Sequence, residues 1–460
     1  MNSKAIYQGG VIGLNRDDLL INGVGYIVAC LFLIVAFLLG FPIQFLTIAF
    51  MTLTYLVFRP KQFFHPNNVV FGFYFLYVVL PSTIDYFLND NALWGGVGSQ
   101  THGHYLLTFS LYFLFIGSIT WFLKKAFPIS ARNVGECDQY FKKRFKYETT
   151  FLLVLLLFLY SLIYVYLYKT GGLSSWIYDY KKVYLLGRKD VGHISLLLSV
   201  YSNFVVFVLG LVFVSKKRGV SRLVFFLIIF IWVMIPVAFL FGLKSRLIVL
   251  LIIFFIPFLL KIELSFRKGL WLFVTFIALF FIGNYIRSDG YYSDFSMFVG
   301  YLPSYFNSYI LHDMLIKDFS PDYFTTIQWT FKKILDFLDI DNGFEFAAMS
   351  NWLTSVYFPK QWYDFSATQQ WPIESEIYLN YGGTVLMVAP IFIYSFYISV
   401  VYFLACERKY IPLLFLYTYE FFRFFGSFRG SMLEWQLWVY LPMYLFLALM
   451  LLFVLKRRCI

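Results

Sequence analysis

The sequence is poor in charge and in cysteine, and each shortage excludes a class of protein. Only 13% of its 460 residues are charged, whereas 60% are hydrophobic, so the chain cannot cover itself with a water-soluble surface. Its four cysteines, Cys30, Cys137, Cys406 and Cys459, fall in apolar runs or in basic segments. They predict neither a structural disulfide nor a Cys/His metal cluster.

The motifs of several enzyme and transporter classes are also missing. The sequence contains no Gly-x-Ser-x-Gly, no Gly-rich phosphate-binding loop and no His-Glu-x-x-His, so a hydrolase or a nucleotide-driven pump has no motif here. It shows no internal repeat and no paired Gly/Pro-broken helices, which counts against a secondary transporter. No cleavage site follows the first apolar run, and we expect that run to serve as a signal anchor.

Long apolar runs dominate what is present. About 20 apolar residues suffice to cross the hydrocarbon core as a helix, and the pattern predicts an all-α polytopic integral membrane protein with about twelve transmembrane helices. The expected spans are residues 21–39, 41–58, 69–87, 105–123, 150–168, 196–214, 223–241, 247–261, 270–286, 383–404, 411–425 and 435–455.

These spans divide the chain into three parts. We expect an N-terminal bundle of about nine transmembrane helices in residues 1–286, one large polar loop in residues 287–381, and about three further helices in residues 382–460. The loop is rich in Tyr, Phe, Trp and Leu, so it is not a disordered linker. Apolar residues recur at intervals of three and four in 301–316 and 324–338, which predicts amphipathic helices lying at the membrane interface.

Basic clusters set the expected orientation, because Lys and Arg are retained in short cytoplasmic loops. Seven basic clusters fall on one side of the predicted bundle if the N-terminus is cytoplasmic. They are Arg59-Pro60-Lys61, Lys124-Lys125, Lys142-Lys143-Arg144, Lys216-Lys217-Arg218, Arg267-Lys268, Arg408-Lys409 and Lys456-Arg457-Arg458. Both termini are then cytoplasmic, loop 287–381 faces outward, and the net charge of +12 is a topology signal that gives little support to nucleic-acid binding.

Basic residues on the outer side are candidate ligands, because they have escaped this retention. Lys244 and Arg246 lie in a short turn between two apolar spans, where they either snorkel to lipid headgroups or form an anion site. Arg188 and Arg287 lie in or beside outer loops. Arginine offers a bidentate fork to phosphate, so a lipid-linked diphosphate suits these positions.

Arg423 and Arg429 repeat this pattern near the last span. Glu420 precedes Arg423 by three residues on the same helical face, so an ion pair and a ligand role are both open for Arg423. Arg429 has no such neighbour and is the better ligand candidate. His312 is the only histidine of the large loop; it is either a surface residue or a general base, and Asp313 beside it would point about 100° away on a helix.

Two short passages carry a resemblance to a known family. They are the basic turn Gly242-Leu243-Lys244-Ser245-Arg246 between apolar spans and the passage Glu374-Ser375-Glu376-Ile377-Tyr378-Leu379-Asn380-Tyr381-Gly382-Gly383 before a span. Together with a large late outer loop, they resemble the Wzy-type oligosaccharide repeat-unit polymerases, the O-antigen and related polysaccharide polymerases of bacteria. In that family the turn commonly reads Gly-x-Arg-small, and Lys244 stands where this arginine is expected. We expect the second passage to be a turn that seats the return of the loop.

The resemblance implies a metal-independent glycosyltransferase of GT-C-like fold, without a cofactor, in the bacterial inner membrane. It would join oligosaccharide repeat units carried on undecaprenyl diphosphate at the periplasmic face, together with membrane lipid and a chain-length-regulating co-polymerase. His312 would be the base. The diphosphates would be bound by Lys244, Arg246, Arg429, Arg188, Arg287 and Arg423. An O-antigen ligase of GT-C-like fold and a lipid-linked oligosaccharide flippase remain alternatives, and the sugar and linkage are open.

Overall fold

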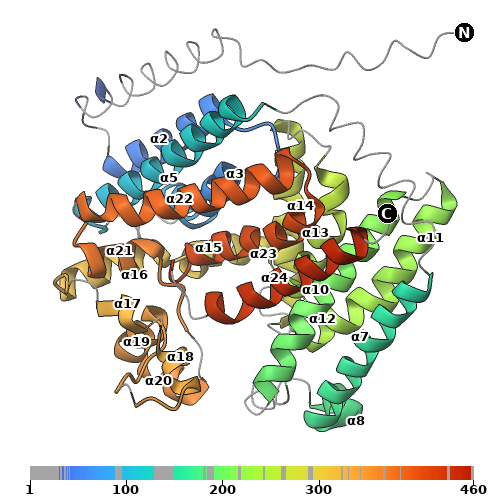
Figure 1. The fold of residues 1–460 in the computed structure, drawn as a ribbon. Helices are drawn as coiled ribbons and strands as arrows, with labels where there is room; N and C mark the ends of the chain where they lie inside the picture. Colours follow the sequence, from blue (N-terminus) through green and yellow to red (C-terminus); the bar gives the residue numbers. More distant parts are fainter. Residues whose placement is uncertain are drawn as a thin grey trace, which may run out of the picture.

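The computed structural model of the chain is helical, without a strand in the parts that it describes (Figure 1). The described residues are 31, 34–35, 38, 40, 42–88, 96–128, 149–179, 183, 191–215, 219–241, 244–260, 266–287, 294–322, 325–329, 331–341, 343–365, 368–383, 385–432 and 436–456. The expected span at 21–39 therefore lies almost wholly outside the described residues.

Six helical stretches are long and apolar enough to cross a membrane, by length and composition. They are α3 (Pro66–Tyr74) with η1 (Phe75–Val79) and α4 (Leu80–Leu88), α5 (Ser99–Ala126), α7 (Thr149–Lys169), α10 (Gly192–Ser215), α11 (Val220–Ile229) with η4 (Phe230–Met234) and α12 (Ile235–Leu240), and η5 (Val385–Met387) with α22 (Val388–Tyr402) and η6 (Phe403–Glu407). The chain is accordingly an α-helical, multi-pass membrane protein.

Further helices occupy the positions of the remaining expected spans. They are α2 (Ile43–Phe58), α13 (Lys244–Leu259), α14 (Phe266–Arg287), α23 (Ile411–Ser427) and α24 (Gln436–Lys456). Four of these, α2, α13, α14 and α24, contain apolar stretches shorter than the six above. The total of twelve spans and the GT-C-like arrangement thus stay predictions.

Helix α10 lies at the centre of one half of the helix bundle. Its apolar window is 83% buried inside the protein, against 17% for the neighbouring α7. It packs against α13 so closely that a Cβ built on Gly210 would lie 2.2 Å from the backbone oxygen of Phe254. Because only glycine permits this approach, Gly210 sets the spacing of the two helices.

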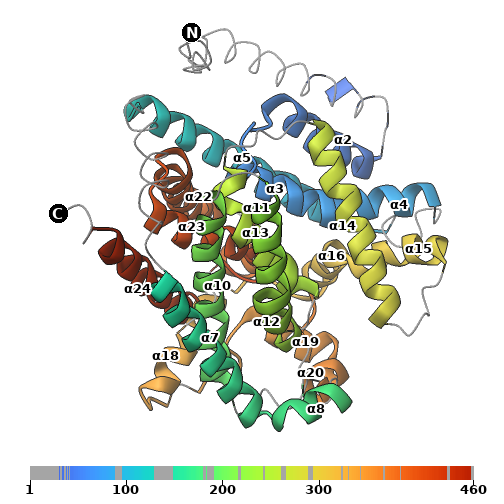
Figure 2. The same ribbon diagram turned by 90° about the vertical axis from the view of Figure 1, so that its right-hand side faces the viewer.

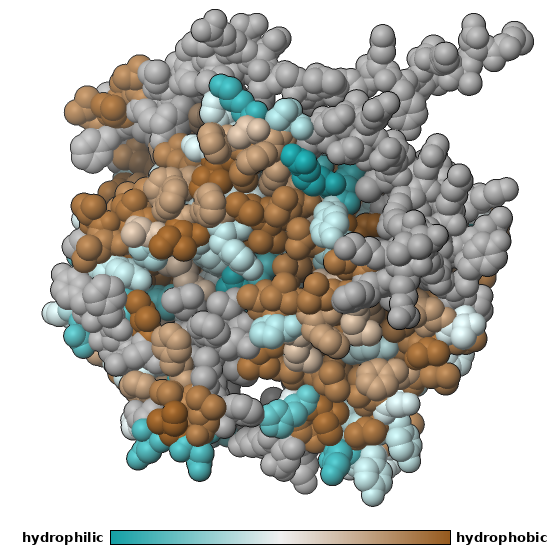
Figure 3. Space-filling model, in the orientation of Figure 1, coloured by the Kyte–Doolittle hydropathy of each residue, from teal (hydrophilic) through white to brown (hydrophobic). Residues whose placement is uncertain are grey.

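The other half is organised around α5, along which α22 runs (Figure 1). Among the residues coloured in Figure 3, hydrophobic ones predominate on this face, as expected for helices bordered by lipid. Many of the outward-facing side chains are large and apolar, among them Leu157, Tyr164 and Trp232. Cys406 is buried at the end of the α22 stretch as a free thiol.

The two ends of the bundle differ in character. At one end Lys124 forms an ion pair with Glu407 at 2.6 Å, and Arg408 donates to the backbone oxygen of Phe127. Helices α5, α22 and α24 all finish toward this end, and α11 starts there (Figure 1). The clusters Lys124-Lys125 and Arg408-Lys409 therefore lie at the same end, and the membrane side that this end faces stays a prediction.

At the opposite end, the large polar loop forms helices and is ordered, as predicted. The helices are α15 (Phe295–Tyr305), α16 (Ser308–Asp318), α17 (Thr325–Trp329), α18 (Lys332–Phe337), α19 (Met349–Tyr357), α20 (Pro359–Phe365) and α21 (Ile373–Tyr381). Helix α15 lies beside α4 (Figure 2). Outside this loop, the short helix α8 (Gly172–Tyr178) follows α7.

Helix α16, which overlaps residues 301–316, departs from the interfacial arrangement that we expected there. Helices α16 and α21 are internal: Leu311 and Leu315 of α16 are buried, and so is nearly all of α21. They share a small core with α19, and Trp371 is fully enclosed in it, with its Nε1 donating to Thr354. A buried tryptophan with a satisfied N–H packs this core, so Trp371 serves neither in an interfacial belt nor in a sugar-binding surface.

Gly210→Ala tests the helix spacing. The added methyl would force α10 away from α13, and overpacking of this kind costs about 1–3 kcal/mol. We expect a clear fall in the melting temperature of the purified protein in detergent. Gly72→Ala on α3, where nothing lies within 4 Å of the built Cβ, is the matched control and should be neutral or slightly stabilising. Equal melting temperatures for both variants would contradict this account.

Candidate functional site

The short helix α21 lies at the centre of the polar interior. It ends at Gly382, whose φ of 65° lies in the left-handed region that glycine adopts readily. We expected a turn over this passage; the structure has a helix, and only Gly382 and Gly383 make the sharp exit. Four polar side chains of α21 are buried: Glu374, Ser375, Glu376 and Asn380. Burial of polar groups costs free energy unless each is partnered, so their partners define the site.

The carboxyl of Glu374 meets α3. Tyr74 donates its hydroxyl to Oε1, while Oε2 is buried without a hydrogen-bond partner among the described residues. Burial raises the pKa of Glu374 to about 8, although the hydrogen bond from Tyr74 acts in the opposite direction. The carboxyl is therefore largely protonated at neutral pH, and in that form it can donate a hydrogen bond.

Ser375 begins a chain of hydrogen bonds that leads to a second histidine. Its Oγ lies 3.1 Å from Nδ1 of His312, and Nε2 of His312 lies 3.1 Å from Nδ1 of His104. His312 is fully buried, whereas His104, on α5, is partly exposed. The chain therefore runs from the buried helix α21 through α16 to a partly exposed imidazole.

Both ring nitrogens of His312 are engaged, and this limits what the ring can do. Burial, and secondarily the charge of His104, holds the pKa of His312 well below its usual value, so the ring is neutral. In one neutral arrangement His312 donates to Ser375 and accepts from Nδ1 of His104, which leaves Nε2 of His104 as a bare acceptor. His312 thus positions His104, and His104 is the ring with a nitrogen left for a substrate.

The free nitrogen of His104 points to the glycine turn after α21. A Cβ built on Gly383 would lie 2.7 Å from Nε2 of His104, and the φ of Gly383 is +64°. A side chain at this position would cover the nitrogen. No hydrogen bond engages Nε2 of His104 within the described part of the chain, and only glycine permits this close approach of the ring.

Asp313 does not orient His312, in agreement with the sequence-based expectation. Its carboxylate accepts from the backbone N–H of Gly98 at 2.9 Å and from Thr101 at 2.7 Å, and it pairs with Lys317 at 2.6 Å. Burial pushes the pKa of Asp313 up, but the hydrogen bonds from Lys317, Thr101 and Gly98 outweigh it and hold the pKa below its usual value. Asp313 therefore fixes α16 to the start of α5, where His104 lies.

A third histidine, His102, also lies in this region. Its Nδ1 is hydrogen-bonded with the hydroxyl of Tyr309 on α16 and lies 3.2 Å from Oγ1 of Thr47 on α2. Among the described residues, no three His, Cys, Asp or Glu side chains are arranged to hold a metal ion. The grouping of His102, His104 and His312 therefore joins helices α2, α5 and α16 by hydrogen bonds.

Glu376 holds a loop that follows α23, the 428–432 loop (Phe428–Met432). Ser431 donates to Oε1 of Glu376, and the backbone N–H of Met432 donates to Oε2 at 2.7 Å. The backbone N–H of Ile373, at the start of α21, donates to the oxygen of Phe428 at 3.1 Å. The 428–432 loop is thus attached at both of its ends to the first turn of α21.

Arg423 forms an ion pair. The sequence had left both an ion pair and a ligand role open for this residue. Its guanidinium contacts Glu420 at 2.9 Å, and it donates to the backbone oxygen of Met432 at 3.3 Å. Glu420 is fully buried and also accepts from Tyr397 at 2.9 Å. A buried carboxylate needs this compensation, so the structure favours a structural role for Arg423.

Arg429 is different, because its side chain is exposed. Its guanidinium lies over the ring of Tyr77, 5.6 Å from the ring centre, and the residue as a whole is exposed. No ion pair engages it among the described residues. Since Arg429 belongs to the 428–432 loop, α21 positions both this free cation and the histidine chain.

The remaining predicted cations lie elsewhere. Arg246 is partly buried, donates to the backbone oxygen of Ser199 at 2.8 Å and to Ser202 at 2.7 Å, and lies over Phe241. Lys244 begins α13 and Arg287 ends α14, but their side chains lie outside the described part, as does the whole of Arg188. Arg246 is thereby tied to α10, and no described contact joins it to the histidine chain.

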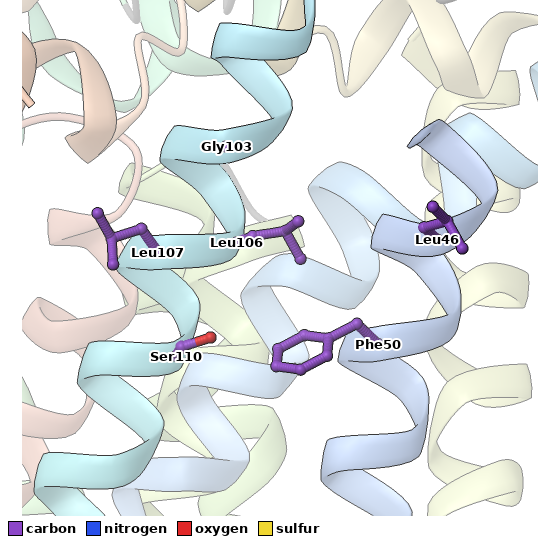
Figure 4. Close-up of a pocket in the computed structure, with 6 residues that line it drawn as sticks. All are labelled: Leu46, Phe50, Gly103, Leu106, Leu107 and Ser110. Carbon is purple, nitrogen blue, oxygen red and sulfur yellow. The ribbon is translucent and has the colours of Figure 1, made fainter. Parts of the chain in front are cut away.

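An apolar groove begins beside the histidines. It has a volume of about 370 Å³ between α2 and α5 and is lined by Leu46, Phe50, Gly103, Leu106, Leu107 and Ser110. Phe50 and Leu106 point toward one another across it (Figure 4). Gly103 stands between His102 and His104 in the sequence, so the groove runs along the helix that carries these histidines, although neither of them lines it.

The sequence-based reasoning missed His104, Ser375 and Tyr74 as members of the site. One sequence pattern did indicate this site. Thr101-His102-Gly103-His104 places two histidines in one helical turn at the end of a span, where polar residues are costly. Comparison of the chain with protein-family models, curated proteins and solved structures gives no match. The resemblance to Wzy-type polymerases therefore stays a prediction.

The raised pKa of Glu374 predicts a pH-dependent stability. The folded chain, with a pKa of about 8 against an ordinary value of 4.5, holds a proton that the unfolded chain loses, so stability falls as pH rises from about 5 toward 8, by about 1 kcal/mol per pH unit. In Glu374→Gln this slope should be reduced. Melting temperatures between pH 6 and 8 measure it. Glu345→Gln, at an exposed position, should keep the wild-type slope, and an unchanged slope in Glu374→Gln would refute the assignment.

The structural role of Arg423 is tested by a pair of substitutions. Arg423→Ala leaves Glu420 buried without its cation and should cost about 3–5 kcal/mol in unfolding free energy. The double variant Glu420→Gln/Arg423→Met should recover part of that loss. Arg429→Ala removes an exposed cation and should change stability by less than about 0.5 kcal/mol. If Arg423→Ala were as mild as Arg429→Ala, the ion pair would not be structural.

Proposed function

We propose that this chain is a metal-independent glycosyltransferase that polymerises undecaprenyl-diphosphate-linked oligosaccharide repeat units at the periplasmic face of a bacterial inner membrane. One observation carries the proposal: the first turn of α21 holds a neutral histidine chain and a loop with a free arginine at the same end of a membrane-embedded bundle. A base and an anion-binding cation are the two groups that transfer from a diphosphate requires.

The proposed reaction uses His104 as the base. An acceptor hydroxyl of the newly arrived repeat unit attacks the anomeric carbon of the growing glycan, and the bond between that carbon and the diphosphate oxygen breaks. The hydroxyl proton passes to Nε2 of His104, while His312 and Ser375 hold the opposite side of the ring. Undecaprenyl diphosphate leaves with the bonding electrons, and one glycosidic bond has formed.

Arg429 is proposed as the ligand of the leaving diphosphate. Its side chain is exposed and, within the described chain, carries no carboxylate partner that would neutralise it, and the ring of Tyr77 supports it from one side. The groove between α2 and α5 suits the isoprenoid chain of a lipid-linked substrate, because it is apolar and runs along the helix that carries His104. Together they would place a diphosphate near the membrane surface with its lipid tail in the bilayer.

The other predicted ligands have different roles in this proposal. Arg423 supports the 428–432 loop through its bond to Met432, and it acts as a positioning residue. Arg246 is held by α10, so it serves as a second diphosphate ligand only if that contact opens. Lys244, Arg287, Arg188 and a co-polymerase partner remain predictions.

His104→Ala and Arg429→Ala should both abolish polymerisation in a folded protein. Loss of a general base typically costs about 10²–10⁴ in rate, which would leave a single capped repeat unit in a gene-deletion host complemented with either variant. His193→Ala, at an exposed position of α10, and Lys360→Ala, at an exposed position of α20, are the matched controls and should restore the full glycan ladder.

A gel of the glycan ladder from the deletion strain also separates a polymerase from a ligase or a flippase. Loss of all glycan from the lipid A core in the deletion strain would indicate a ligase or a flippase, because a polymerase mutant still transfers one unit. A full ladder with His104→Ala and Arg429→Ala, at normal protein levels, would contradict the proposed site.

A further inference from the structure

Tyr77 lies where the helical stretch from α3 to α4 changes its hydrogen-bonding pattern. It belongs to the π-helical turn η1, and Pro81 follows in α4. Pro81 has no N–H to donate to the backbone oxygen of Tyr77, four residues before it, so the α-helical hydrogen bond to this oxygen cannot form. Single π-turns inside α-helices occur frequently at functional sites. This one interrupts the helix at the residue whose ring lies under the guanidinium of Arg429.

The ring of Tyr77 is held by aromatic neighbours. It stacks on Phe73, one helical turn earlier, with ring centres 4.6 Å apart and an interplanar angle of 14°. On another side it makes a T-shaped contact with Phe306, which follows α15, at 4.9 Å between ring centres. Only 3% of the residue is exposed. Because the ring is packed in this way, its hydroxyl occupies a fixed position.

The hydroxyl of Tyr77 makes no hydrogen bond within the described part of the chain. A buried polar group without a partner costs free energy, which points to a partner outside the chain. The groups that act electrostatically on this hydroxyl are the guanidinium of Arg429 and the side chain of Tyr305 on α15. The guanidinium of Arg429 likewise has no hydrogen bond or ion pair among the described residues.

Two hydrogen-bond donors are therefore close together, and no described group accepts from either of them. A guanidinium can only donate, and the phenol hydroxyl, which could accept, forms no hydrogen bond with it. A ligand that satisfies both must supply acceptor oxygens and a negative charge. A phosphate group supplies both, whereas a neutral sugar hydroxyl would leave the charge of Arg429 without a counter-charge.

We infer that Tyr77 is a second ligand of the phosphate that Arg429 binds, and that its hydroxyl donates a hydrogen bond to a phosphate oxygen. Only the identity of this phosphate, as part of a lipid-linked diphosphate, rests on the proposed function. Helix α21 positions both ligands, because Glu374 holds Tyr74, three residues before Tyr77, and Glu376 holds the 428–432 loop. The bound phosphate thus joins the same two elements that α21 joins.

The test measures binding of farnesyl diphosphate, a short isoprenoid diphosphate, to the purified chain in detergent by isothermal titration calorimetry. Tyr77→Phe keeps the ring and removes only the hydroxyl. Its affinity should fall at least about tenfold, as expected for the loss of a hydrogen bond to a charged group. Arg429→Ala should weaken binding further. Tyr86→Phe on α4, where the residue is 43% exposed, is the matched control and should bind as the wild type does.

Melting temperatures establish that each variant is folded. A folded wild type that does not bind farnesyl diphosphate, or a folded Tyr77→Phe with wild-type affinity, would overturn the inference. Inorganic pyrophosphate is the second probe. Weaker binding of pyrophosphate than of farnesyl diphosphate would support a lipid-linked ligand, whereas equal binding of the two would show a site for a free anion and contradict the lipid-linked assignment.

This binding measurement can fail independently of polymerisation. Weaker binding by Tyr77→Phe in a chain that does not polymerise would support the two-residue phosphate site and overturn the proposed reaction. Polymerisation by the wild type, together with wild-type affinity in Tyr77→Phe, would leave the proposed function intact and overturn the role of Tyr77.

Discussion

The hydrogen bonds made by the first turn of α21 are the constraint on which the polar interior depends. Glu374, Ser375 and Glu376 are consecutive, buried and polar, and each finds its partner on a different element: Tyr74 on α3, His312 on α16, and the 428–432 loop. Because each unpartnered group would cost free energy on burial, α21 is stable in this position only when all three elements are in place. The histidine chain and Arg429 are therefore assembled together.

This arrangement also separates the molecule into two ends with different chemistry. The end formed by α15–α21 carries the neutral histidine chain and Arg429, whereas the opposite end carries the Lys124–Glu407 pair and Arg408. Between them lie apolar helices packed as closely as the contact of Gly210 with Phe254 allows. The proposed substrate site at one end is thereby separated from the basic residues at the other.

The sequence predicted those features that depend on local patterns. Apolar runs located the six helical stretches that are long enough to cross a membrane, and the three-residue spacing of Glu420 and Arg423 offered their ion pair as one of two interpretations, because neighbours on one helical face are close whatever the rest of the fold does. It could not predict contacts between distant segments. His312 seemed solitary because its partner His104 lies 208 residues away, and the passage at 373–381 was interpreted as a turn because its helix is stabilised by burial against other elements. The sequence could rank the arginines as candidate diphosphate ligands. Among the described candidates, only Arg429 is exposed and without an ion pair.

The most direct test of the central claim is polymerisation by the purified protein. Repeat units on undecaprenyl diphosphate are extracted from the gene-deletion strain, mixed with the wild-type chain in nanodiscs, and the lipid-linked products are analysed by mass spectrometry. The account predicts a series of products that differ by one repeat unit, formed by the wild type and by His193→Ala but not by His104→Ala. Unchanged single units with the wild type, under conditions where the protein is folded, would contradict it.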